Sequence, residues 1–189
     1  GIGVNGMNMG GRKTVKPSAK NWDKNIPPPE YFKELYRVSK NQIIWGGNYF
    51  PLNESRCWVI WDKGETMYSR DFAEGEMAWT SFDKVVRFFK KSPNQLKRIH
   101  PTQKPVKLYE WLLDNYSFEG SKILDTHLGS GSHAIAAHYH KNCGEFVGAE
   151  LDSEYFEAFV KRFKESSVQV NIFQEIQERE TIQNNLFND

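Results

Sequence analysis

The residues best suited to chemistry lie in one glycine-rich segment in the last third of this 189-residue chain. Residues 125–132 read Asp-Thr-His-Leu-Gly-Ser-Gly-Ser and follow a short apolar run at 122–124. An alanine-rich stretch with helical spacing comes next, and a second apolar run, 146–149, ends at Glu150. Strand, glycine turn, helix and a second strand with a terminal carboxylate predict one half of a nucleotide-binding α/β unit. Glycines let the backbone approach a ligand closely, and Glu150 can accept hydrogen bonds from both hydroxyls of a ribose.

A second segment lies shortly before the glycine turn. Residues 100–105 read His-Pro-Thr-Gln-Lys-Pro, and Pro105 precedes an apolar stripe with helical spacing that runs to Tyr116. A glycine turn alone is a weak signal, whereas the ordered combination of these two segments is far more specific.

The elements expected to position these segments alternate along the chain. Alternating strands and helices favour an α/β fold in which a mostly parallel sheet is covered by helices on both faces. The glycine turn comes late in the chain, whereas it usually comes first in a dinucleotide enzyme, which argues against a nicotinamide or flavin dehydrogenase. We expect helices at 30–39, 105–116, 132–140 and 153–164, strands at 42–45, 57–61, 76–79, 84–90, 123–124 and 146–151, and an edge strand at 168–173.

Composition excludes several classes of protein. A net charge of +1 does not indicate a general polyanion binder, although residues 84–107 hold eight Lys or Arg and no acid. Such a basic stretch fits either a phosphate-backbone partner or a solvated face. No apolar run approaches the roughly 20 residues of a membrane span. Cys57 and Cys143 match no metal or redox spacing, so we expect reduced thiols in a cytoplasmic protein.

Five histidines raise the question of a metal site. Three of them, His133, His138 and His140, lie within two turns of one predicted helix, but no carboxylate shares their face. We therefore expect no metal. His100 is better explained as a residue that supports the helix after Pro105.

The order of these pieces resembles the β group of DNA amino-methyltransferases, in which the sequence motifs are circularly permuted. Residues 100–105 resemble the family's His-Pro-x-x-Lys-Pro segment, and 125–132 resemble its Asp-Pro-Phe-x-Gly-Ser-Gly-Thr turn. Residues 147–152 resemble its Gly-Ile-Glu-x-Asp strand end. The resemblance covers nearly the whole chain and implies a Rossmann-like, S-adenosylmethionine-dependent methyltransferase fold. It implies one domain over 1–165, with a catalytic half at 1–99 and a cofactor half at 100–165, followed by a polar tail at 166–189.

The resemblance also implies which residues hold S-adenosylmethionine. The methionine portion would be bound by Asp125, whose carboxylate can engage the ammonium group, and by the turn residues Gly129, Ser130 and Gly131. Glu150 would take the ribose hydroxyls. Thr102, Gln103 and Lys104 would close over the methionine end, with Lys104 suited to its carboxylate.

Two departures from the family pattern stand out. Thr126 and His127 occupy the positions of the family's Pro-Phe, which makes the turn less rigid. The family's catalytic Asp-Pro-Pro-Tyr motif occurs nowhere in this chain. Family members continue that motif into Gly-Ile-Gly, and residues 1–3 read Gly-Ile-Gly, so we expect the motif immediately before Gly1.

The leading hypothesis is a DNA methyltransferase of the restriction-modification type, acting on an exocyclic amine of a flipped base. Adenine N6 is favoured over cytosine N4 because of the Gly-Ile-Gly continuation. The alternative is a remnant that binds S-adenosylmethionine or DNA without transferring a methyl group.

The expected partner is double-stranded DNA, with a homodimer as a further option. Only residues 91–99 fill the position where related enzymes insert a recognition region, so residues 6–24, short loops or a second subunit must read the DNA sequence. A basic, glycine-rich loop around Arg12 and Lys13 that orders on DNA is the candidate.

Overall fold

The computed structural model describes residues 26–93 and 98–168. The predicted DNA-binding loop around Arg12 and Lys13 and all but the first residue of the predicted edge strand at 168–173 lie outside these ranges. The chain divides into two compact units, Gly1–Leu108 and Tyr109–Asp189. The boundary falls inside helix α2, Val106–Tyr116.

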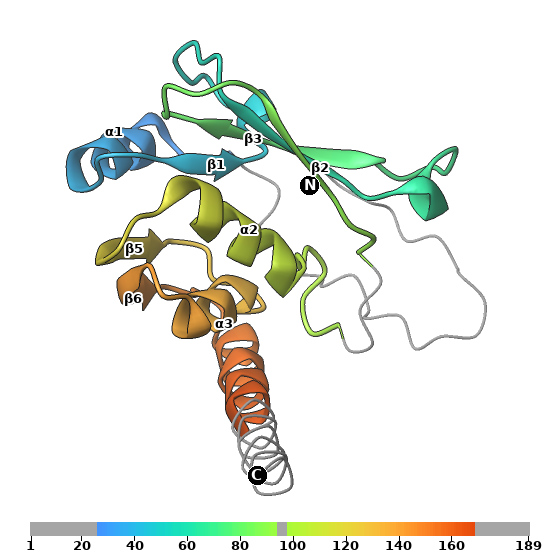
Figure 1. Ribbon diagram of the computed structural model, residues 1–189, viewed down its shortest axis with the longest axis vertical. Helices are drawn as coiled ribbons and strands as arrows, with labels where there is room; N and C mark the ends of the chain where they lie inside the picture. The colour runs from blue at the N-terminus through green and yellow to red at the C-terminus, as the bar shows by residue number, and fades with distance from the viewer. Residues whose placement is uncertain (1–25, 94–97, 169–189) are drawn as a thin grey trace, which may run out of the picture. The chain divides into compact units, whose positions relative to one another are not determined.

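The described residues of the first unit form an α-helix and a mixed four-stranded sheet (Figure 1). Helix α1, Pro29–Val38, begins with proline at its first position, carries Glu30 in its first turn and ends with Arg37 in its last. Proline has no backbone N–H, but an N–H at the first helical position would have no partner within the helix, so nothing is lost there. The charges of Glu30 and Arg37 complement the helix dipole.

Four strands form the sheet of the first unit, in the order β1-β3-β2-β4. Strand β3 runs antiparallel to both of its neighbours, and β4 runs parallel to β2. Gly46, with φ of 72°, ends β1 in a left-handed conformation that favours glycine. The strands are β1 (Ile43–Trp45), β2 (Trp58–Asp62), β3 (Gly75–Thr80) and β4 (Arg87–Lys90), with single 3₁₀ turns at Gly47–Tyr49 and Glu65–Met67.

Aromatic and β-branched residues of β2 and β3 build the core of this unit. Val59 and Ala78 are fully buried, and Trp61 and Trp79 are nearly so. The indole N–H of Trp61 donates to the carbonyl of Lys91 at 2.7 Å, and that of Trp79 donates to Asn53 at 2.7 Å. Both large rings are therefore buried without leaving a polar group unsatisfied.

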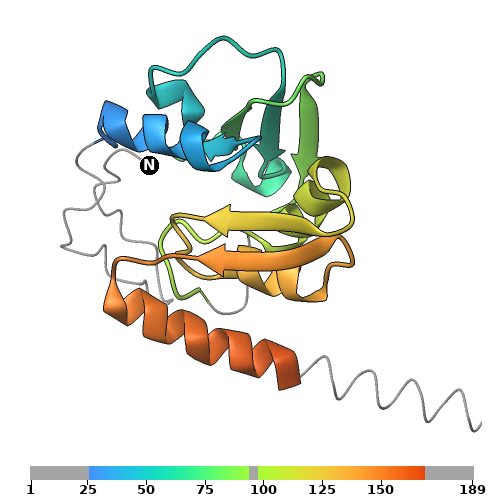
Figure 2. The ribbon, with the colours of Figure 1, turned by 90° about the vertical axis from the view of Figure 1, so that its left-hand side faces the viewer.

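The second unit contains a β-α-β arrangement. Strands β5 (Ser121–Asp125) and β6 (Cys143–Gly148) pair in parallel, and helix α3 (Ser132–Tyr139) connects them. Figure 2 shows the two strands side by side and the helix over residues 153–168 that follows β6. The carboxylate of Asp152 accepts hydrogen bonds from the backbone N–H groups of Glu154 and Tyr155, which caps that helix.

The element types agree with the sequence predictions, whereas some bounds and directions differ. Strand β6 starts earlier than the predicted run 146–151, at Cys143, and ends at Gly148. The expectation of a mostly parallel sheet holds for the pairs β2–β4 and β5–β6, but β3 is antiparallel to β1 and β2. A pattern of apolar residues marks a strand without fixing its direction, which pairing across the sheet decides.

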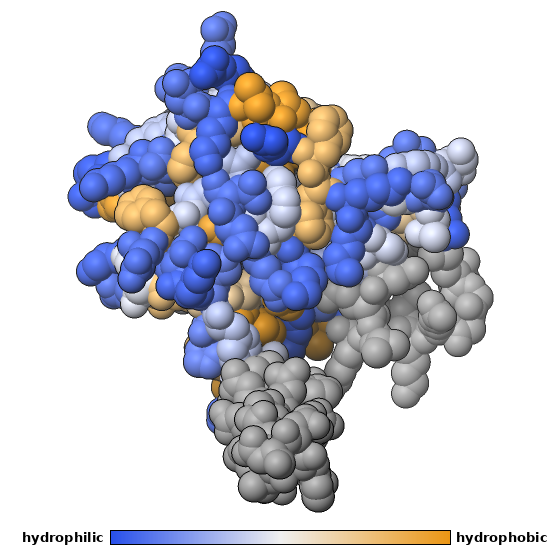
Figure 3. Space-filling view, viewed as in Figure 1, coloured by the Kyte–Doolittle hydropathy of each residue, from blue (hydrophilic) through white to orange (hydrophobic). Residues whose placement is uncertain are grey.

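Hydrophilic side chains cover most of the face drawn in Figure 3, and hydrophobic ones show as separate patches among them. Exposed apolar side chains include Phe88, 66% exposed, and Leu151, 99% exposed. No helix among the described residues is long and apolar enough to cross a membrane.

Replacing Val59 with alanine tests the core of the first unit. Val59 of β2 is fully buried, so V59A removes apolar contacts and leaves a cavity. We expect a loss of about 2 kcal/mol in the free energy of unfolding. The same change at Val85, which is 58% exposed, should cost less than about 0.5 kcal/mol in a chemical denaturation experiment. Equal losses at the two positions would contradict this account of the core.

Candidate functional site

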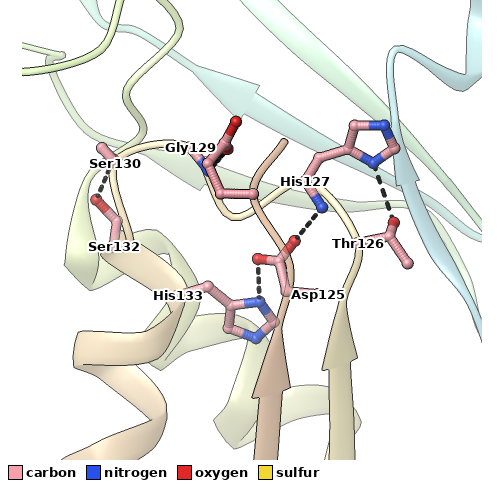
Figure 4. A network of polar contacts seen from close by, with 8 residues as sticks. Asp125, Thr126, His127, Gly129, Ser130, Ser132 and His133 are labelled. Atoms are coloured by element: carbon pink, nitrogen blue, oxygen red, sulfur yellow. Dashed lines mark hydrogen bonds and ion pairs between the residues drawn. The ribbon is translucent and has the colours of Figure 1, made fainter. Parts of the chain in front are cut away.

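The glycine turn of the second unit joins the end of β5 to the start of α3 (Figure 4). Gly129 and Gly131 adopt left-handed conformations with φ of 54° and 69°. The N–H of Leu128 donates to the carbonyl of Ala149 at 2.9 Å, and that of Ala149 donates to Asp125 at 2.8 Å. These bonds connect the turn to the residues that follow β6, so the carboxyl ends of β5 and β6 lie next to the same turn.

Glu150 lies against this turn and fixes its conformation. One carboxylate oxygen, Oε2, accepts the N–H of Gly129 at 2.7 Å, and the other, Oε1, accepts the N–H of Asp152 at 2.9 Å. The predicted ribose acceptor is thus brought together with the glycines, although 21 residues separate it from Gly129.

Asp125 ends β5 and faces the first turn of α3. Its Oδ1 accepts the backbone N–H of His127 at 3.0 Å, and its Oδ2 lies 3.0 Å from Nδ1 of His133. Burial raises the pKa of Asp125, but the contacts with His133 and His127 outweigh it, and the pKa falls below its ordinary value. The carboxylate is therefore ionised at neutral pH despite being mostly buried.

The helix over residues 153–168 supports the turn through Arg162 and Phe159. The guanidinium of Arg162 donates to the carbonyl of Ser130 at 2.7 Å and to Oγ of Ser132 at 2.9 Å. A Cβ added at Gly131 would lie 1.8 Å from a ring carbon of Phe159. Position 131 therefore requires glycine for two reasons, its backbone conformation and the ring beside it.

Residues 100–105 belong to the first unit. Ring atom Nδ1 of His100, which is buried, accepts the N–H of Thr102 at 3.2 Å. The side-chain oxygen of Gln103, 2% exposed, accepts the N–H of Ile99 at 3.0 Å. Of the predicted cofactor residues here, Gln103 therefore organises its own loop, whereas Thr102 is exposed.

Lys104 forms part of a charge cluster in the first unit. Its ammonium lies 2.9 Å from Oε2 of Glu76, whose Oε1 lies 3.1 Å from the ammonium of Lys63. Burial raises the pKa of Glu76, but the two lysines outweigh it and lower the pKa overall. The ammonium of Lys104 also lies 5.1 Å from the centre of the Trp45 ring. Lys104 is thus held by a carboxylate on β3 and a ring on β1.

Three features of these sites escaped the sequence analysis. The contact between Nδ1 of His133 and Oδ2 of Asp125 joins residues eight positions apart across a strand, a turn and a helix. No sequence motif around Arg162 indicates that its side chain contacts the turn. The third feature is Leu151, which follows Glu150 directly and is 99% exposed. An apolar residue next to a predicted ligand residue is a signal in the sequence that could have identified it. Among the described residues, no group of three or more His, Cys, Asp or Glu could hold a metal ion.

A cavity of about 450 Å³, open to solvent and lined by polar and apolar atoms in similar parts, lies between β6, α3 and the helix over residues 153–168. Its lining includes Leu128, Phe146, Phe156, Phe159 and Phe163, and none of the predicted site residues. The candidate site is therefore the open glycine turn, where convergent polar groups are found, and not this cavity.

A glycine turn at the carboxyl end of a strand, with an acidic residue after the next parallel strand, is the arrangement found in Rossmann-like α/β folds. The family model N6_N4_Mtase, described as DNA methylase, matches residues 12–161. The chain belongs to this DNA methylase family.

Curated relatives and a solved structure agree with this assignment. The type II methyltransferase M2.DpnII of Streptococcus pneumoniae is 27% identical over 146 residues, which is 76% of this chain and 49% of that protein. The type II methyltransferase M.HpaI of Haemophilus parainfluenzae is 34% identical over 86 residues, 46% of this chain and 26% of that protein. The chain thus spans half or less of the length of these two relatives.

The crystal structure of the M1.HpyAVI complex with S-adenosylmethionine matches with a TM-score of 0.54 at 21% identity. The match covers 74% of this chain and 84% of that one. It shows that the two chains share an α/β methyltransferase fold.

Gly131→Ala tests how tightly the turn is packed. Gly120, with φ of 79° and open space around its Cα, provides a control for the backbone conformation alone. We expect about 1 kcal/mol of destabilisation for G120A and roughly 3 kcal/mol for G131A, because only the latter meets Phe159. Thermal or urea unfolding measures both, and equal effects would show that Phe159 does not constrain the turn.

Proposed function

We propose that this chain binds S-adenosylmethionine at the glycine turn and acts in a DNA methyltransferase that modifies an exocyclic amine of a base. The carboxylate of Glu150, fixed against the turn by two backbone N–H groups, is the observation that carries this proposal. Family membership supplies the reaction class, and the turn supplies a site of the right chemistry.

Glu150 suits the two hydroxyls of a ribose. Each carboxylate oxygen can accept two hydrogen bonds, and one backbone N–H occupies one position on each oxygen. The remaining positions can accept one hydroxyl each, which is the bidentate contact that a ribose diol offers. Because the backbone already holds the carboxylate, little side-chain entropy is lost when the ligand binds.

Asp125 and the glycines suit the methionine portion. An ionised, mostly buried carboxylate attracts an ammonium group more strongly than an exposed one does. Gly129 and Gly131 have no side chains to keep a ligand from the backbone, and Ser130 lies between them. Leu151, next to Glu150, offers an apolar surface for the flat face of adenine.

We extend the proposal to Thr102, Gln103 and Lys104, whose assignment rests on the resemblance of residues 100–105 to the family segment. Lys104 would contact the carboxylate of the methionine portion as a compact point charge. Gln103 would act by holding the loop, because its side-chain oxygen accepts the N–H of Ile99.

Bound S-adenosylmethionine would supply a methyl group on a positively charged sulfur, ready for attack by an amine. The chain's own contribution is to orient that methyl group by fixing the ribose at Glu150 and the ammonium at Asp125. Holding donor and acceptor at contact distance can lower a barrier by several kcal/mol. The target base would have to leave the duplex to be reached, and adenine N6 is the amine we favour.

Glu150→Gln tests the binding site. The amide loses the negative charge and places an N–H₂ group where an acceptor is needed, so we expect binding of S-adenosylhomocysteine to weaken about 10- to 100-fold. Glu157→Gln, an exposed change on the following helix, should leave affinity unchanged. Isothermal titration calorimetry measures both, with circular dichroism to confirm folding. Equal affinities of E150Q and the wild type would contradict the ribose assignment.

Methyl transfer itself is tested with radiolabelled S-adenosylmethionine and DNA duplexes whose adenines or cytosines carry the methyl group in advance. Blocked adenines should abolish incorporation, and blocked cytosines should not. Binding of the cofactor with no incorporation into any duplex would favour the alternative, a remnant that binds without catalysis.

DNA binding is expected to involve Arg12 and Lys13, which lie outside the described residues. Replacing both with alanine should weaken binding to a duplex and reduce the slope of log affinity against log salt by roughly two. Lys33→Ala, an exposed change on α1, provides the control. Fluorescence anisotropy at several salt concentrations measures the slope, and an unchanged slope for the double variant would exclude these residues from the interface.

A further inference from the structure

His133 lies in the first turn of α3 and has no role in the function proposed above. Its Nδ1 lies 3.0 Å from Oδ2 of Asp125, the carboxylate proposed to hold the cofactor's ammonium group. The side chains are 18% and 15% exposed, respectively. The pair is therefore shielded from most of the solvent screening that weakens surface ion pairs.

Two aromatic rings fix the position of the His133 imidazole. The ring stacks on Tyr109, with centroids 4.6 Å apart and an interplanar angle of 14°. It meets Phe146 edge-on, with centroids 5.0 Å apart. With one face and one edge packed, Nδ1 stays directed at Asp125, and the carboxylate is held between this nitrogen and the N–H of His127 (Figure 4).

We infer that His133 is a positioning residue for Asp125 and makes cofactor binding proton-linked in this chain. This inference rests on the proposed function, because it needs an ammonium group at Asp125. A protonated His133 and the ligand's ammonium are both cations that compete for one carboxylate, and at this burial they repel each other. Binding then favours neutral His133, which still donates its Nδ1 proton to Asp125 while the Nε2 proton leaves to the buffer.

The side chains around His133 and Asp125 determine which group could release such a proton. His127 from the turn is the second histidine, and its ring nitrogen Nδ1 lies 3.0 Å from the hydroxyl of Thr126. Tyr109 of α2 stacks on the His133 ring. Phe146, which faces the pair from β6, carries no charge. Histidine is the side-chain type suited to exchanging a proton near neutral pH, and the described residues in contact with Asp125 include two, His127 and His133.

Titration calorimetry of the 189-residue chain with S-adenosylhomocysteine tests the inference. Measurements at pH 6.5 in two buffers of different ionisation enthalpy give the number of protons released. We expect the wild type to release a fraction of a proton and to bind several-fold more tightly at pH 8 than at pH 6. His133→Asn keeps an N–H donor near Asp125 but does not titrate, so it should abolish both effects while it retains binding at pH 8.

Two matched variants separate His133 from its neighbours. His127→Phe keeps the backbone N–H that Asp125 accepts and should still release the proton. His138→Asn, on the same helix but in ring contact with Tyr139 and Phe163, should behave as the wild type. Proton release that disappears in H127F but persists in H133N would assign the linkage to His127 and overturn the inference.

The outcomes distinguish this inference from the proposed function. If the wild type does not bind S-adenosylhomocysteine, the proposed function fails. If it binds without releasing a proton, or H133N releases as much as the wild type, the function stands and the inference is wrong. Nuclear magnetic resonance of the His133 ring in the wild type needs no variant, and its titration midpoint should move to lower pH when ligand is added.

Discussion

The hydrogen bond between the N–H of Gly129 and the carboxylate of Glu150 determines the geometry of the second unit's site. It joins the turn after β5 to the chain after β6 and fixes both at once. Without it, the glycine turn would have a wide choice of backbone conformations, because glycine accepts positive and negative φ almost equally. The same bond aims the carboxylate, so turn and acidic residue form one rigid unit.

Behind the turn, the partly buried guanidinium of Arg162 satisfies a second backbone group. Ser130 is buried, and its carbonyl faces the helix over residues 153–168 rather than solvent. A buried carbonyl without a donor costs about 1–3 kcal/mol, and Arg162 supplies that donor while its burial lowers its own pKa. The helix therefore supports the site through a hydrogen bond and through Phe159, although none of its residues carries a recognisable motif.

The sequence predicted the parts of this molecule that depend on local patterns. The strand, turn and helix at 121–139 could be anticipated because apolar runs and glycines mark them directly. Strand β6 was placed too late because Gly144 and Glu145, both exposed, do not look like strand residues. The antiparallel direction of β3 and the pairing of His133 with Asp125 depend on tertiary packing, which no local pattern encodes.

In each unit a partly buried carboxylate contacts basic side chains, and the type of basic side chain differs between the two units. Glu76 lies between two lysine ammonium groups, at 3.1 and 2.9 Å. Asp125 contacts a histidine, a side chain that can donate a hydrogen bond with or without a positive charge. A lysine at position 133 would hold Asp125 permanently and compete with a ligand's ammonium at every pH. A histidine can give up its charge and keep its hydrogen bond, so the carboxylate stays positioned while its negative charge becomes available.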